Sequence, residues 1–389
     1  MSSAALASRR PAATASAAAA ATATPAPEIP RARPPSASVP ALRGELDVEL
    51  LLRHAGPHRV RLRWETQGEP TLPAVVVLGG ISATRHAGAS AVDAEPGWWQ
   101  EQVGPGRALD PARRRLIGLD WLGADGALDV PIDTADQADA VAAVLDALGV
   151  ARLAAFVGSS YGAMVGLAFA ARYPARLARL VAISGAHRPH PFASAWRGLQ
   201  RKIVALGLDH GAADEALSLA RQLAMLSYRT PEELAARFDA PVRLTGQRAR
   251  AASDDYLEAC GARYVARWSP AAFLRLSESI DLHAVDPARI VTPTTLVGVA
   301  EDRLVPLSDL RTLASALAGR CRLHELSSAY GHDAFLKEPA AIAAILRAPG
   351  GAPRAGRDEW GGERSEQRGS SHEGAAERAQ RASRPEGEL

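Results

Sequence analysis

The chain has 389 residues, and its 45 Lys and Arg nearly balance its 43 Asp and Glu, for a formal net charge of +2. Such a balance gives no reason to expect a nucleic-acid partner. No run of 18 apolar residues occurs outside a weakly hydrophobic alanine tract near Ala17, so we expect no membrane span. Cys260 and Cys321 form no ligand cluster, so no metal or cofactor is predicted, and a reducing cytoplasm fits.

The two ends of the chain have compositions that do not favour folding. Residues 1–43 are mostly Ala, Pro, Ser and Thr with several Arg, as in disordered tails, transit peptides or chains begun at a start codon too far upstream. Residues 348–389 are rich in Gly, Glu, Arg, Ser and Gln, with Trp360 as the one aromatic. We predict two disordered tails around one catalytic domain at 44–347.

Short apolar runs alternate with helical patterns in the first half of this domain. Strands with alternating or β-branched residues are predicted at 59–66, 74–80, 114–121, 152–158 and 179–184. Helices are predicted at 134–150 and 160–174. This alternation predicts an α/β fold with a mostly parallel central sheet and helices on both faces.

The pattern changes at about His187 and becomes helical as far as Val285, with no convincing core strand. Strands return at 293–302 and 322–327, separated by a helix and followed by a last helix after Lys337. We expect the segment at about 187–285 to form a helical lid over the carboxyl ends of the strands, where ligands bind in open α/β folds.

The segment FVGSSYGAMVG contains the G-x-S-x-G nucleophile elbow between a predicted strand and a predicted helix. The pattern centres on Ser160, between Gly158 and Gly162, and the glycines are needed because the turn is tight. Ser160 would lie at the helix N-terminus, whose dipole favours developing negative charge. Ser159 is expected to point elsewhere. The motif in this setting predicts the α/β-hydrolase fold with Ser160 as the nucleophile.

A serine nucleophile needs a base, and in this fold an acid and then a histidine follow it in the chain. A late strand is followed by Glu301, Asp302 and Asp309. We choose Asp302, although it could instead cap a helix, and His332, because the interval between them leaves room for one helix and one strand. His324 is the competing imidazole, but it lies within a predicted strand, where a structural role is expected.

Attack on an acyl carbon creates an oxyanion that needs positioned donors. One expected donor is the backbone N–H of Tyr161, directly after the nucleophile. The other is expected from Gly80 or Ile81, in the loop where this fold places its second donor, although Gly79-Gly80 could form a simple turn.

Three further stretches make the sequence similar to the homoserine O-acyltransferases of the α/β-hydrolase type. They are GWWQEQVGPGRALD (97–110), LARQLAMLSYRTPEELAARF (219–238) and YGHDAFL (330–336). Together with the elbow, the resemblance spans about residues 45–346.

The resemblance implies transfer of an acyl group from acyl-CoA to L-homoserine through an ester on Ser160, in methionine biosynthesis. It also implies that Arg221 grips the homoserine carboxylate, that Tyr228 on the same helix face adds a hydroxyl, and that Asp333 pairs with the ammonium. Family members of this kind suggest a homodimer.

The oxyanion loop LGGISATRHAG departs from the HALTGDSH-like sequence of acetyl-transferring members and resembles members assigned to succinyl transfer. A succinyl group carries an extra carboxylate, for which Arg85 is the nearby cation. We therefore predict succinyl-CoA as donor, with acetyl-CoA as the alternative and serine as an alternative acceptor. A plain esterase with the same triad would need no amino-acid clamp, and a non-catalytic relative would need no strained serine.

Overall fold

The computed structural model describes residues 39–348, so most of the two predicted tails, 1–43 and 348–389, lies outside this range. An eight-stranded sheet has the order β1-β2-β4-β3-β5-β6-β9-β10. The strands are β1 (Ala41–Leu52), β2 (Gly56–Gln67), β3 (Ala74–Leu78), β4 (Arg115–Leu119), β5 (Ala155–Ser159), β6 (Leu180–Ile183), β9 (Thr294–Val299) and β10 (Cys321–Leu326).

The sheet opens with a long antiparallel hairpin, in which β1 pairs with β2 from Ala41↔Gln67 to Leu52↔Gly56. The sequence pattern predicts β2 but not β1. The boundary predicted for the tail at residue 43 is therefore wrong, because the first three residues of β1 belong to the sheet. β1 is an edge strand with mostly exposed or half-buried side chains, so its apolar pattern is weak.

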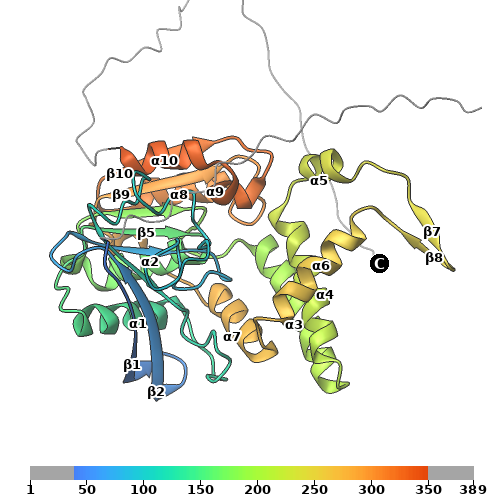
Figure 1. The fold of residues 1–389 in the computed structure, drawn as a ribbon, viewed down its shortest axis with the longest axis horizontal. Helices are drawn as coiled ribbons and strands as arrows, with labels where there is room; N and C mark the ends of the chain where they lie inside the picture. Colours follow the sequence, from blue (N-terminus) through green and yellow to red (C-terminus); the bar gives the residue numbers. More distant parts are fainter. Residues whose placement is uncertain (1–38, 349–389) are drawn as a thin grey trace, which may run out of the picture. The chain divides into compact units, whose positions relative to one another are not determined.

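From β4 to β10 every neighbouring pair of strands is parallel, which confirms the mostly parallel sheet. Alternate residues of a strand face opposite sides. Val76, Phe156 and Leu180 pack in a core with α1 (Thr134–Ala147), α2 (Tyr161–Arg172) and α8 (Leu307–Ala316). Val75, Val157 and Val181 pack on the other face with α9 (Ala334–Lys337) and α10 (Pro339–Arg347) (Figure 1).

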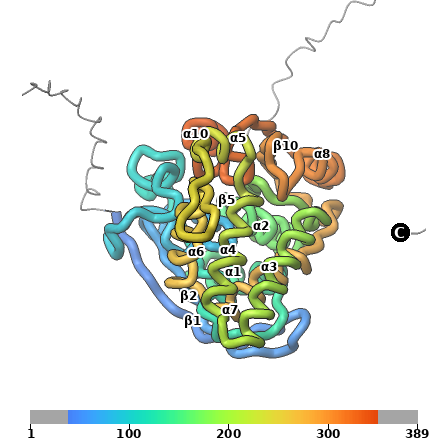
Figure 2. Tube along the Cα trace, turned by 90° about the vertical axis from the view of Figure 1, so that its right-hand side faces the viewer, coloured from blue at the N-terminus to red at the C-terminus, as the bar shows by residue number. Residues whose placement is uncertain are grey.

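Five helices and a small hairpin lie between β6 and β9. They are α3 (Pro191–Asp209), α4 (Ala213–Tyr228), α5 (Pro231–Phe238), β7 (Arg243–Thr245), β8 (Arg248–Arg250), α6 (Asp254–Val265) and α7 (Pro270–Asp281). α3 and α6 both pack against α4 (Figure 2). Val204, Leu217, Tyr264 and Phe273 give these helices a small core of their own. Among residues 39–348, no helix has the length and apolar character that crossing a membrane requires.

Candidate active site

The nucleophile elbow lies at the carboxyl end of β5, in the middle of the sheet. Ser160 has φ 53° and ψ −116°, a left-handed conformation that is costly for a side chain other than glycine. A Cβ on Gly158 would overlap the backbone of Gly162, and one on Gly162 would overlap the carbonyl of Leu78. The two glycines are thus required by close backbone approach. Ser159, as expected, points elsewhere and is fully buried.

The structure brings Ser160, His332 and Asp302 together in one hydrogen-bonded chain. Ser160 Oγ lies 2.8 Å from His332 Nε2, and His332 Nδ1 lies 2.7 Å from Asp302 Oδ2. Asp302 also fills the capping role considered for it, because its Oδ1 accepts the backbone N–H groups of Leu304 and Val305. These two bonds fix the carboxylate while its other oxygen faces the imidazole.

The electrostatics of His332 suit a base that is charged during part of a reaction. Burial disfavours the imidazolium, but the charge and hydrogen bond of Asp302 outweigh burial and raise the pKa of His332. Asp309 lines the cavity in front of Ser160, but the partner of His332 is Asp302. Two other competing residues lie elsewhere. Glu301 accepts hydrogen bonds from Ser327 and Ser328, and His324 is part of β10.

The predicted oxyanion donors border the same serine. Tyr161 is the first residue of α2, and the first N–H groups of a helix have no acceptor within the helix. A Cβ on Gly80 would lie 3.8 Å from Ser160 Cβ, and Ile81 lines the cavity in front of Ser160. The side chain of Tyr161 is engaged separately, with its hydroxyl 2.5 Å from Ser279 Oγ.

Arg221 and Tyr228 both line this cavity, as the shared helix face predicted. The Arg221 guanidinium lies over the rings of Tyr228 and Tyr264, at 5.4 and 4.9 Å from their centroids. Within residues 39–348 it makes no ion pair with a carboxylate. The Tyr228 ring is stacked on His332 at 6.0 Å, so α4 reaches the histidine directly.

Asp333 is expected to face the substrate and pair with its ammonium, but it lies outside the cavity lining. Its carboxylate pairs with Arg229 Nη2 at 3.3 Å, and it is not among the residues that line the cavity. Burial raises the pKa of Asp333, and the Arg229 charge opposes this rise. A substrate ammonium could bind Asp333 only by sharing the carboxylate with Arg229. Arg229 lies inside the family-like stretch at 219–238, but nothing in the sequence pattern marks it as the partner of Asp333.

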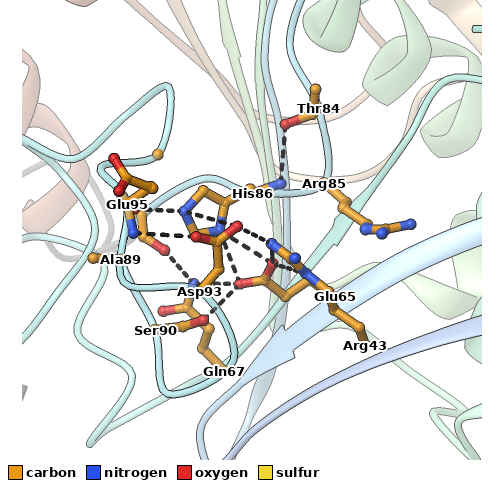
Figure 3. Close-up of polar contacts among 12 residues, drawn as sticks. Arg43, Glu65, Gln67, Thr84, Arg85, His86, Ala89, Ser90, Asp93 and Glu95 are labelled. Atoms are coloured by element: carbon orange, nitrogen blue, oxygen red, sulfur yellow. Dashed lines mark hydrogen bonds and ion pairs between the residues drawn. The ribbon is translucent and has the colours of Figure 1, made fainter.

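The structure also contradicts the role proposed for Arg85. Its guanidinium pairs with Asp120 at 3.2 Å, its backbone N–H donates to the same carboxylate, and it does not line the Ser160 cavity. Figure 3 shows the Arg85 side chain pointing away from its neighbour His86. Nearness in sequence failed here because Asp120, at the end of β4, already supplies the counter-charge.

The loop after β3 is held by a buried polar cluster around His86 (Figure 3). His86 Nδ1 lies 3.1 Å from Glu65 Oε2, and Nε2 lies 2.7 Å from the Glu95 carbonyl. Arg43 pairs with the same Glu65 at 2.8 Å. The bond to Glu65 raises the pKa of His86, and two acceptors favour the doubly protonated ring. The cluster ties the oxyanion loop to the β1–β2 hairpin.

Three arginines and one carboxylate line the cavity in front of Ser160. They are Arg188, Arg197, Arg221 and Asp309. Arg197 is held by Asp281 at 2.6 Å. The sequence pattern does not single out Arg188 or Arg197, because the helical segment contains no motif at either position. Arg188 and Arg221 make no ion pair within residues 39–348, so they are the two cations of the cavity that a substrate carboxylate can reach.

Comparison with known proteins decides the family. Residues 73–339 match the alpha/beta hydrolase fold family. A homoserine O-succinyltransferase of Xanthomonas campestris pv. campestris is 61% identical over 311 residues, which cover 80% of this chain and 84% of the relative. The chain belongs to the homoserine O-acyltransferase family.

Other relatives show the range of this family. A homoserine O-acetyltransferase of Thermus thermophilus is 32% identical and covers 74% of this chain and 85% of the relative. A serine O-succinyltransferase of Frateuria aurantia is 31% identical, with coverage of 74% and 93%. The solved homoserine O-acetyltransferase from Bacillus anthracis superposes with a TM-score of 0.71 at 16% identity, covering 79% of this chain and 96% of that chain. At this identity the superposition shows the shared fold.

Proposed function

We propose that this member of the homoserine O-acyltransferase family transfers a succinyl group from succinyl-CoA to the side-chain hydroxyl of L-homoserine, in methionine biosynthesis. The observation that carries the proposal is the chain of hydrogen bonds from Ser160 through His332 to Asp302 beside a cavity with three arginines. The relative at 61% identity supports the succinyl donor and the homoserine acceptor.

In the first half-reaction Ser160 Oγ attacks the thioester carbon while its proton passes to His332 Nε2. The N–H groups of Tyr161 and of Gly80 or Ile81 stabilise the oxyanion. The carbon–sulfur bond then breaks, and the CoA sulfur takes the proton from His332. The products are free CoA and a succinyl ester on Ser160.

In the second half-reaction the homoserine hydroxyl gives its proton to His332 and attacks the ester carbon. The bond to Ser160 Oγ breaks, and Ser160 recovers its proton from His332. We propose Arg221 as the group that binds the homoserine carboxylate, because its guanidinium faces the cavity without a carboxylate partner of its own in residues 39–348. Arg188 lines the cavity and makes no ion pair within residues 39–348, so we propose that it binds the succinyl carboxylate in place of Arg85.

The test pairs each donor with each acceptor: succinyl-CoA or acetyl-CoA with homoserine or serine, measured as thiol release. We expect the highest kcat/KM with succinyl-CoA and homoserine. A preference for acetyl-CoA would overturn the donor assignment, and a preference for serine would overturn the acceptor. Thiol release that is independent of any acceptor would indicate a hydrolase.

We also propose a cytoplasmic homodimer that works without a bound metal or cofactor. Large apolar side chains are exposed along α3 and α4, at Leu199, Leu206 and Leu219, where a second copy could cover them. Cys260 and Cys321 are free thiols, as a reducing compartment favours. Light scattering on Leu206→Glu tests the dimer, which this charge should weaken.

A further inference from the structure

A groove of about 640 Å³ opens beside the Ser160 cavity, and its lining is strongly cationic. Its charged residues are six cations with no carboxylate among them: Arg221, Arg229, Arg237, Arg263, Arg267 and Lys337. We call this set and the space between them the cationic groove. α4, α5, α6, the segment after α6, and α9 all contribute to it.

Four of these six cations have no carboxylate partner within residues 39–348. Arg229 pairs with Glu233 and Asp333, and Arg237 pairs with Glu233. For Arg221, Arg263, Arg267 and Lys337, the described part of the chain provides no carboxylate within ion-pair distance. Arg263 donates a hydrogen bond to Cys260 Sγ at 3.3 Å, a neutral partner that leaves its charge uncompensated. Unpaired cations that converge from separate elements raise the local concentration of anions.

The cationic groove is joined to the Ser160 cavity. Arg221 and Tyr264 line both spaces, so they form the boundary between them. Lys337 follows His332 by only five residues, on α9. A substrate whose reactive carbon lies at Ser160 can therefore extend past Arg221 into a positively charged space.

An acyl-CoA has this division of chemistry: a thioester at one end, an uncharged arm, and a nucleotide with a diphosphate and a 3′-phosphate. Arginine binds phosphate oxygens with two parallel N–H groups, and lysine adds a point charge. Tyr256 and Trp268 also line the groove and offer rings on which a base can stack. We propose that the cationic groove binds the phosphate-bearing nucleotide of the acyl-CoA donor. This inference rests on the proposed function.

The test uses two donors that differ only in the nucleotide end: succinyl-CoA and the succinyl thioester of N-acetylcysteamine. In the variant Arg263→Ala/Arg267→Ala, KM for succinyl-CoA should rise about tenfold or more, since each lost charge-assisted bond weakens binding. Its kcat, and KM for the short thioester, should stay near the wild-type values. Adenosine 3′,5′-bisphosphate should inhibit the wild type in competition with succinyl-CoA and inhibit the variant less.

The matched control is Arg113→Ala/Arg114→Ala, which removes the same charge directly before the amino end of β4, whereas Ser160 follows the carboxyl end of the parallel strand β5. An equal rise in KM for succinyl-CoA in both variants would reduce the effect to net charge and overturn the inference. The inference would also fail if Arg263→Ala/Arg267→Ala affected both donors equally or neither.

Failure of the proposed function is recognised separately, in the wild type. A wild type that releases thiol from neither succinyl-CoA nor acetyl-CoA contradicts the acyl-CoA donor. Calorimetry with adenosine 3′,5′-bisphosphate then tests the groove by itself. Binding that Arg263→Ala/Arg267→Ala abolishes supports the groove, and absence of binding to the wild type overturns it.

Discussion

At the scale of single residues, Ser160 has a strained backbone conformation and a side chain that is hydrogen-bonded to His332. The strain at φ 53° is maintained by the pairing of β5 with β3 and β6 on one side and by α2 on the other. This geometry directs Oγ toward His332 and away from the buried position of Ser159. The local conformation therefore distinguishes two adjacent serines that are chemically identical.

Replacing Ser160 with Ala should lower the rate of acyl transfer by a factor on the order of 10³ or more, because the triad acts as a unit. The fold should stay unchanged. The measurement is thiol release, with circular dichroism as the check on folding. Ser159→Ala is the matched control and should keep most of the activity. Tandem mass spectrometry of the peptide that contains both serines, after mixing with succinyl-CoA alone, should locate the acyl group on Ser160; an acyl group on Ser159 would refute the assignment.

The raised pKa of His332 predicts the pH dependence of the reaction. The base must be neutral, so kcat/KM should rise with pH through a pKa above the ordinary value near 6.5 for histidine. Asp302→Asn removes the charge that raises this pKa. The variant should therefore lose activity by about 10⁴ and show its acidic limb at lower pH. If the acidic limb of the kcat/KM profile lies at the same pH in Asp302→Asn as in the wild type, a group other than His332 controls it.

At the scale of elements, the helices between β6 and β9 are tied to the histidine segment by side chains. Arg229, directly after α4, joins Glu233 of α5 to Asp333, beside the base. Thr230 Oγ1 donates to the Ala329 carbonyl, and Tyr228 stacks on His332. The position of His332 thus depends on the helices that carry Arg221, which couples the proposed acceptor site to the base.

We expect Arg229→Ala to lower kcat by about 10- to 100-fold and the free energy of unfolding by about 3 kcal/mol, because Asp333 loses its ion-pair partner and Glu233 loses one of two. Arg237→Ala is the control: it pairs with the same Glu233 but is exposed, so its effect on unfolding should stay below about 1 kcal/mol. Urea unfolding and steady-state kinetics give the two values. Similar losses from both variants would show that Arg229 has no special role.

At the scale of the whole molecule, the active site depends on contacts between distant parts of the chain. Arg43 on β1 pairs with Glu65 on β2, which holds His86 in the oxyanion loop. The indole of Trp99 donates to the Phe335 carbonyl, joining the GWW stretch to α9. Side-chain contacts therefore connect the edge of the sheet to the loops around Ser160 and His332.

Truncation tests this link. Removing residues 1–43 should give a lower thermal midpoint than removing residues 1–38, by several degrees, because Ala41–Arg43 pair with β2 and Arg43 also binds Asp93. Differential scanning calorimetry compares the two. Arg43→Ala in the chain that lacks only residues 1–38 removes the ion pairs of Arg43 and keeps the strand. Its midpoint therefore shows how much of the difference comes from the ion pairs. Equal midpoints for the two truncations would mean that the start of β1 contributes nothing.

The sequence by itself determined the parallel sheet and the elbow, because both have a strong local signal. Buried strands are continuous apolar runs, and a tight turn leaves glycines at fixed spacing around Ser160. The choice of Asp302 and His332 followed from chain order and from the room that one helix and one strand require. Family-like stretches added Arg221 and Tyr228, which the structure places at the cavity.

Only the tertiary structure decided which charges are free and which are already paired. Arg85 lies near the oxyanion donor in sequence, yet Asp120 neutralises it; Asp333 follows the base, yet Arg229 holds it. Arg188 and Arg197 line the cavity although no sequence motif marks them. β1 joins the sheet by pairing with β2, although its exposed side chains give it only a weak strand pattern. Ion pairs and edge-strand pairing join residues far apart in the chain, so short-range sequence patterns carry no record of them.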